Sequence, residues 1–234
     1  MAIPRYLAMT AAEIAASSPL PPKIAWMACH FSPYTTGLSN RPGALPPDSL
    51  LILNDVTPIH GHSREAVAGQ LAQCVEAFSC RGILLDFQRP GSAETAALAA
   101  YLVQALPCPV AVSEPYAGEL SCPVFLPPPP HHVPLAEYLA PWQGRALWLE
   151  QALDAETITL TESGACIAPL PPGERFADGH ADDALHCHYQ IQLTDSQAVF
   201  TLFRTPGDLE ALLSEAEFLG VTQAVGLFQE LHSP

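Results

Sequence analysis

Short apolar runs alternate with helically spaced apolar positions along the first half of the chain. Between the runs, Ser63 stands at an N-cap position before one helical pattern, and a second pattern covers 93–106. This alternation predicts parallel strands joined by helices. Four runs have the length and composition of buried strands, at residues 24–31, 50–54, 82–87 and 109–113.

The connections between apolar runs shorten in the second half. Only about eight residues separate Ser113 from Cys122, too few for a usual crossover helix. A brief helix is predicted at 135–139, so some connecting helices are expected to be short or missing. Further strands are predicted at 122–126, 146–149, 157–160 and 224–228.

Two alternating runs near the C-terminus predict a β-hairpin. They cover 187–193 and 198–203, and the polar residues 194–197 between them form a turn pattern. A helix opened by Asp208 and ended by Gly220 follows. We therefore expect a loop and hairpin insertion over 168–204, before the last strand.

The predicted core strands number eight, which suits a closed barrel. They begin at Ile24, Leu50, Gly82, Pro109, Cys122, Ala146, Thr157 and Ala224. We predict an α/β fold of one domain over 1–234, a trimmed (β/α)₈ TIM-type barrel with residues 1–23 as an N-terminal extension holding a helix at 11–16. A doubly wound sheet is the alternative, but it needs a glycine-rich phosphate loop that this sequence lacks. No cofactor is predicted.

The net charge argues against some classes of binding partner. The net charge is −15, from nine Lys and Arg against 24 Asp and Glu, whereas nucleic acids and anionic membranes bind clustered positive charge. Neither is predicted as a partner. No stretch is apolar and long enough to span a bilayer, and residues 1–21 lack the apolar core of a signal peptide. Seven scattered cysteines without Cys-x-x-Cys spacing are typical of reduced thiols. We expect an acidic cytoplasmic protein, with its oligomeric state left open.

The strand at 82–87 carries the most informative polar residues. Asp86 and Gln88 lie two apart at its C-terminal end and share one face, at the end of a barrel strand where chemistry is done. The stretch resembles the signature strand of glycoside hydrolase family 18, Asp-Gly-x-x-x-Asp-x-Glu, with Gly82 and Asp86 matching. Arg81 and Leu84 stand where that pattern has Asp, and Gln88 stands at the position of the catalytic Glu.

The C-terminal third adds a second resemblance to the same family. The hairpin strand at 198–203, the helix after Asp208 and the closing strand at 224–228 follow the family's order, most like its spore-germination and cortex-hydrolysing branch. Phe228 occupies the position of a Trp that lies under the sugar in that family. The resemblance implies that Phe228 stacks on a sugar ring, over a smaller area than Trp.

The resemblance also implies a chemistry. In the family, a Glu protonates the glycosidic oxygen while the acetamido group of the substrate attacks the anomeric carbon, and an Asp orients that group. Asp86 fits the orienting role. Gln88 has no titratable proton, so the loss of the acid removes about 10²–10⁴-fold of rate, although the amide still hydrogen-bonds a sugar oxygen. We predict a catalytically impaired protein that binds a β-linked N-acetylhexosamine glycan.

Other carboxylates offer an alternative. Glu114 and Glu150 follow predicted strands, and either could be a relocated acid in an active glycosidase or another hydrolase. Asp55, also at a strand end, is a candidate substrate-binding residue, as are His30 and Tyr34 on an expected rim loop. Each of these has a plainer interpretation as a solvated or structural side chain. A structural or partner-binding barrel is the third hypothesis.

The histidines supply a rival hypothesis. His186 and His188 share one face of a strand at a spacing that suits a metal ion. They lie on the hairpin outside the predicted barrel, and the first strand lacks the His-x-His of metal-dependent hydrolases. We therefore predict no metal site.

Overall fold

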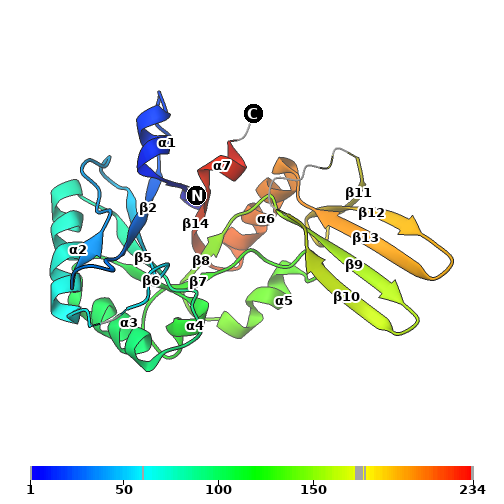
Figure 1. The fold of residues 1–234 in the computed structure, drawn as a ribbon. Coiled ribbons are helices and arrows are strands. Elements are labelled where there is room, and N and C mark those ends of the chain that lie inside the picture. Colours follow the sequence, from blue (N-terminus) through cyan, green and yellow to red (C-terminus); the bar gives the residue numbers. More distant parts are fainter. Residues whose placement is uncertain (1, 60, 172–175, 177, 233–234) are drawn as a thin grey trace.

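Eight parallel strands pair side by side in a ring (Figure 1). The structure is a computed structural model that describes residues 2–59, 61–171, 176 and 178–232. Around the ring the strands are β1 (Arg5–Met9), β2 (Ile24–Phe31), β4 (Leu50–Asn54), β5 (Gly82–Asp86), β6 (Val110–Ser113), β7 (Val124–Leu126), β8 (Leu147–Glu150) and β14 (Val221–Leu227).

The pairing of β1 closes the ring. On one side β1 pairs with β14, Arg5 opposite Ala224, and on the other side with β2, Leu7 opposite Ile24. Both pairings are parallel. The predicted (β/α)₈ TIM-type barrel is therefore confirmed.

The structure corrects the predicted set of barrel strands at two places. Residues 1–23 were expected to lie outside the barrel, but they contain β1, its first strand. The strand predicted at 157–160 belongs instead to β9 (Ala155–Thr161) of a separate antiparallel sheet. The count of eight barrel strands holds because these two differences cancel.

The helices that cover the barrel differ in length, as the short connections in the second half of the sequence predict. Ser63 caps α2, since its side chain accepts a hydrogen bond from the amide of Ala66 at 3.3 Å. Among the described residues, no helix is long and apolar enough to cross a bilayer. The helices are α1 (Ala11–Ala16), α2 (Arg64–Phe78), α3 (Ala93–Ala105), α4 (Glu114–Ala117), α5 (Leu135–Leu139), the 3₁₀ turn η1 (Ala140–Trp142), α6 (Pro206–Phe218) and α7 (Phe228–Leu231). A two-residue strand, β3 (Leu38–Ser39), pairs antiparallel with β2.

Side chains from alternate strand positions fill the inside of the barrel. A Cβ on Gly82 would lie 2.9 Å from the carbonyl oxygen of Pro109 and 3.4 Å from the ring of Trp148, so this position of the signature strand requires glycine. A second apolar layer lies between the ring and its helices. The inner cluster consists of Tyr6, Ala8, Ala25, Leu50, Ile52, Leu84, Ala111, Phe125, Trp148 and Val225.

A five-stranded antiparallel sheet is inserted between β8 and α6 and extends to one side of the barrel (Figure 1). The predicted hairpin forms its strands β12 and β13. The insertion begins at residue 155 rather than 168, and its two ends meet where the amide of Arg204 donates to the carbonyl oxygen of Asp154 at 3.4 Å. In sheet order the strands are β10 (Gly164–Pro169), β9, β13 (Gln197–Phe203), β12 (Cys187–Leu193) and β11 (His180–Asp182).

Candidate functional site

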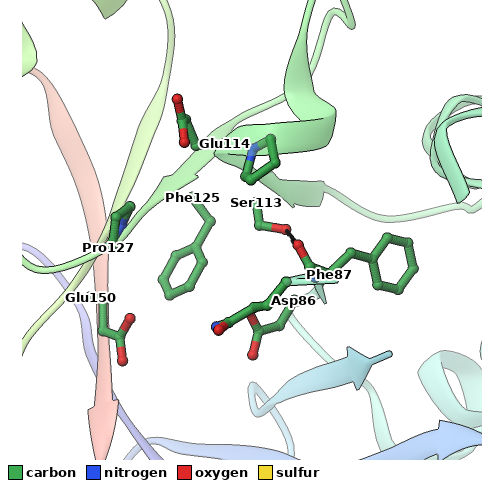
Figure 2. A pocket seen from close by; sticks show the side chains of 9 residues that line it. Asp86, Phe87, Ser113, Glu114, Phe125, Pro127 and Glu150 are labelled. Atoms are coloured by element: carbon green, nitrogen blue, oxygen red, sulfur yellow. Dashed lines mark hydrogen bonds between the residues drawn. The ribbon is translucent and has the colours of Figure 1, made fainter. Parts of the chain in front are cut away.

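A cavity opens at the carboxyl ends of strands β5 to β8 (Figure 2). Its volume is about 260 Å³. This is the end of the barrel where enzymes of this architecture carry their active sites. The cavity is lined by Asp86, Phe87, Gln88, Ser113, Glu114, Pro115, Phe125, Pro127 and Glu150.

Asp86 reaches the cavity because of its position on β5. Leu84, two residues earlier, lies in the inner cluster, so alternation turns Asp86 inward as well. Burial raises the pKa of the Asp86 carboxyl, and the charge of Asp55 raises it further, while a hydrogen bond from Gln88 opposes both effects. That bond runs from Nε2 of Gln88 to Oδ1 of Asp86 at 2.9 Å. The two polar residues of the signature strand are therefore joined.

Glu150 faces the same cavity from β8, opposite Asp86 (Figure 2). It lies two residues after the inward-facing Trp148. Burial, followed by the charges of Asp86 and two other carboxylates, raises the pKa of Glu150 to about 7. A carboxyl group with that pKa holds its proton for part of the time at neutral pH.

Glu114 lies at the rim, where Tyr138 is its neighbour. The hydroxyl of Tyr138 donates to the carbonyl oxygen of Pro127 at 2.9 Å and so fixes one wall of the cavity. Burial raises the pKa of Tyr138, and the charges of Glu114 and Glu150 add to the effect. Both of the predicted alternative acids therefore line the cavity, Glu114 after β6, which neighbours β5, and Glu150 from β8.

The loop after β5 is held by two buried polar side chains. Oγ of Ser113 accepts a hydrogen bond from the amide of Phe87 at 2.9 Å. The carboxylate of Asp55 accepts from the amides of Gln88 and Arg89, both at 3.0 Å. Arg89 in turn donates from Nε to the carbonyl oxygen of Asp55 at 2.6 Å. Asp55, a predicted substrate-binding residue, thus positions the backbone that carries Gln88.

A smaller space of about 70 Å³ continues from the cavity toward the barrel interior. Asp86, Phe125 and Glu150 line both spaces, and Asn54 joins them in the inner one. Asn54 follows the inward-facing Ile52 by two residues, so the same alternation brings it in. The mouth therefore combines three carboxylates, those of Asp86, Glu114 and Glu150, with the amides of Asn54 and Gln88.

Three other predicted residues lie away from this lining. Nδ1 of His30 lies 2.9 Å from the carbonyl oxygen of Phe31, and Tyr34 is 93% exposed. Phe228 begins α7 and stacks on His232, with ring centroids 5.0 Å apart. Phe125 supplies the aromatic surface of the cavity instead. Sequence reasoning missed Phe125, although its strand was predicted.

The two histidines of the rival metal hypothesis contact different partners. Nε2 of His186 lies 2.5 Å from a carboxylate oxygen of Glu215, and Nδ1 of His188 lies 2.8 Å from one of Asp208. Both acids belong to α6. Over the described residues, no three His, Cys, Asp or Glu side chains are grouped to hold a metal ion. These pairs attach the antiparallel sheet to the barrel.

Solved structures share this barrel. The chain superposes on a family 18 N-acetylglucosaminidase from Paenibacillus barengoltzii with a TM-score of 0.60 and 11% identity, covering 98% of this chain and 97% of that one. The barrel has the fold of the family 18 glycoside hydrolases. A family 18 chitinase from Cycas revoluta gives a TM-score of 0.60 at 11% identity over 95% of this chain and 94% of that one. The spore cortex-lytic enzyme SleL of Bacillus cereus gives 0.59 at 9% identity over 99% of this chain and 71% of that one.

No protein-family model and no curated protein sequence matches the chain. At 9–11% identity the structural likeness establishes the fold of family 18 and leaves the activity to be argued from the cavity. The resemblance to that family seen in the sequence is thereby confirmed at the level of the fold.

Proposed function

We propose that the cavity at the barrel mouth binds a β-linked N-acetylhexosamine glycan. One observation carries the proposal: Asp86, Gln88 and the ring of Phe125 line the same cavity, in a barrel with the family 18 fold. Carbohydrate sites combine polar groups that bond hydroxyl and amide groups with an aromatic surface that packs against the ring.

Asp86 is suited to the acetamido group of the sugar. Its half-buried carboxylate accepts hydrogen bonds, and an acetamido N–H is a donor of the right kind. Because Nε2 of Gln88 already donates to Asp86, the carbonyl oxygen of the Gln88 amide is the group left to accept from a sugar hydroxyl. Phe125 would pack on the apolar face of the ring.

The same residues favour binding over cleavage. Gln88 cannot supply a proton to a leaving group at any physiological pH. The Cycas revoluta chitinase was solved as a doubly substituted variant, with a Glu changed to Gln in one of the two substitutions, in complex with an N-acetylglucosamine tetramer. A barrel of this fold thus accommodates such an oligomer with a glutamate replaced.

A second candidate function is hydrolysis with Glu150 as the acid. The observation that favours it is the half-buried position of Glu150 across the cavity from Asp86, with a pKa of about 7. A general acid works best when its pKa lies near the working pH. The raised pKa satisfies that requirement, whereas Gln88 does not.

Calorimetric titration with N-acetylglucosamine oligomers tests the first proposal. We expect the wild type to bind and Asp86→Ala to lose at least tenfold in affinity, because one buried charge-assisted hydrogen bond is lost. Asp195→Ala, which removes an exposed acid from the hairpin turn, is the matched control and should bind as the wild type does. Equal affinity in wild type and Asp86→Ala, or no binding at all, would contradict the proposal.

Hydrolysis of a fluorogenic N-acetylglucosamine oligomer separates the two functions. If binding without cleavage is correct, wild type and Glu150→Gln should be equally inactive, and Gln88→Glu should gain activity by restoring an acid. If Glu150 is the acid, the wild type should be active and Glu150→Gln should lose about 10²–10⁴-fold of rate.

A further inference from the structure

The antiparallel sheet ends in a strand whose outer edge is open. β10 is the terminal strand of the sheet, and β9 is its neighbour (Figure 1). All six residues of β10 are exposed. Within the described part of the chain, no strand pairs with its other side. The edge therefore presents free backbone groups to solvent.

The register identifies those free groups. The amide of Leu170 donates to the carbonyl oxygen of Ala155 at 2.9 Å, so position 170 bonds toward β9. In an antiparallel pair the direction of the backbone hydrogen bonds alternates from one residue to the next. The amide and carbonyl groups of Cys166 and Ala168 therefore also point toward β9. The amide and carbonyl groups of Ala165 and Ile167 then point outward.

β10 lacks the devices that usually protect an edge strand. Gly164–Pro169 contains no charged side chain, and its proline is the last residue. Natural edges are blocked by charge, proline, bulges or short length. β11, at the opposite edge, is three residues long and ends in Asp182. In a chain with a net charge of −15, an uncharged open edge is the exception.

One face of the sheet is apolar out to that edge. Direct cross-strand pairing sets Ile167 beside Ile158, which pairs with Phe200, which pairs with Ile191. A second row runs through Leu160 and its neighbours to Leu193. The exposed fractions are 48% for Ile167, 45% for Ile191, 41% for Leu160 and 76% for Leu193. Solvent-exposed apolar rows of this extent mark interaction surfaces.

We propose that β10 pairs antiparallel with β10 of a second copy of the chain, about a two-fold axis at Cys166. Ala165 then lies opposite Ile167 of the second copy, and the outward-pointing amide and carbonyl groups of Ala165 and Ile167 are bonded in each copy. The two sheets become one sheet of ten strands with a continuous apolar face. A symmetric pairing of this kind is closed, because it uses the same edge twice.

No like charges oppose this pairing with a second copy. Neither paired segment carries a charge, and Glu162, the nearest acid along the strand, falls opposite Leu170 rather than another acid. The axis also brings the two Cys166 residues face to face. They form a non-hydrogen-bonded pair with a Cα separation of about 4.5 Å, which lies within the range for a disulfide. Cys166 is the exposed one of the seven cysteines.

The size of the contact sets its strength. Two edges of six residues each bury much less than the ~1,200 Å² of a standard stable interface. The dimer should therefore be in equilibrium with the monomer and should form as the concentration rises.

Sedimentation velocity over a wide concentration range tests the association. We expect the mass to rise from 25.0 kDa toward twice that value. Ile167→Pro should hold the chain as a monomer, because proline removes an outward amide and leaves the bonds to β9 intact. Leu193→Lys, on the apolar face away from the edge, should still associate. If Leu193→Lys is monomeric and Ile167→Pro is not, the face rather than the edge carries the contact, and the proposal is overturned.

Oxidative cross-linking tests the axis in the wild type itself. Copper phenanthroline with oxygen removes two electrons and two protons from a pair of thiols and leaves an S–S bond. We expect a dimer through Cys166. Ser163→Cys in a Cys166→Ser background is the control, because its two thiols would lie about six residues of strand apart, roughly 20 Å. A monomer at every concentration, or equal cross-linking of the two cysteine positions, overturns the proposal.

Discussion

Alternation along two barrel strands explains where the carboxylates lie. Leu84 and Trp148 pack inside the barrel, and the residues two positions later, Asp86 and Glu150, are turned the same way at the mouth. Burial raises the pKa of both carboxyl groups. The charge of Asp86 raises the pKa of Glu150 further, to about 7, whereas the like charge that acts on Asp86 is that of Asp55.

A stability measurement can detect that raised pKa. Between the ordinary value of 4.5 and about 7, the unfolded chain releases the Glu150 proton while the folded protein keeps it. Stability therefore falls as the pH rises through this window. Glu150→Gln removes the effect, so its free energy of unfolding relative to wild type should rise by on the order of 2–3 kcal/mol between pH 5 and pH 8.

Urea unfolding at the two pH values measures that difference. Glu162→Gln, which removes a carboxylate from an exposed turn, is the control for the substitution itself. A constant difference between Glu150→Gln and wild type across the window would contradict the assignment of a raised pKa to Glu150.

The sequence could predict the polar half of the cavity better than the apolar half. Asp86, Gln88, Glu114 and Glu150 were predicted from strand ends, and all four line the cavity. The roles given to them stay predictions. Phe125 was missed because a run such as Val-Phe-Leu does not say which of its residues turns inward until the ring is closed.

At the scale of the element, α6 illustrates how a helix start depends on two side chains. Thr205 is the N-cap, and its Oγ1 accepts from the amide of Asp208 at 3.2 Å, while the Asp208 carboxylate accepts from the amide of Thr205 at 2.8 Å. Burial alone would raise the pKa of Asp208, but the hydrogen bonds from Thr205 and His188 lower it. The predicted opening residue, Asp208, is thus the third residue of the helix.

Removing this cap should destabilise the protein. We expect Thr205→Ala to cost about 1 kcal/mol and to lower the melting temperature by about 2–4 °C. Thr205→Ser keeps the hydroxyl and should lie close to the wild type. Calorimetry of the three proteins makes the comparison, and an unchanged melting temperature for Thr205→Ala would show that the cap contributes nothing to stability.

The elements that the sequence misplaced have identifiable causes. β1 is five residues long and is followed at once by the capping box of Thr10 and Glu13, so its signal merges with that of α1. β9 alternates from residue 157 to 161, with threonines on one face and Ile158 and Leu160 on the other. That pattern is typical of a sheet with one face in solvent, whereas a barrel strand covered on both sides is apolar throughout. The alternation was the available signal for the second sheet.

At the scale of the whole molecule, the excess of acid opposes folding. The net charge of −15 leaves a self-repulsion that a few ion pairs, such as that between Arg5 and Glu210, offset only locally. Raising the ionic strength from 0.01 M to 0.15 M shortens the screening length from about 30 Å to about 8 Å. We expect the melting temperature to rise by a few degrees, corresponding to about 1 kcal/mol.

Chloride and acetate salts should act alike in this experiment, because screening depends on ionic strength rather than on the anion. A melting temperature that falls with added salt would mean that favourable ion pairs outweigh the repulsion between acids.

The pairing of β1 with β14 also determines when the barrel can close during synthesis of the chain. Arg5 of β1 pairs with Ala224 of β14 in the finished barrel, so the ring cannot close before β14 has been made. At ribosomal rates of about 5–20 residues per second, the second partner of β1 emerges roughly 10–45 s after β1 itself. Throughout that interval the nascent chain carries two unsealed strand edges, so the period of greatest exposure to aggregation ends only when the last strand leaves the ribosome.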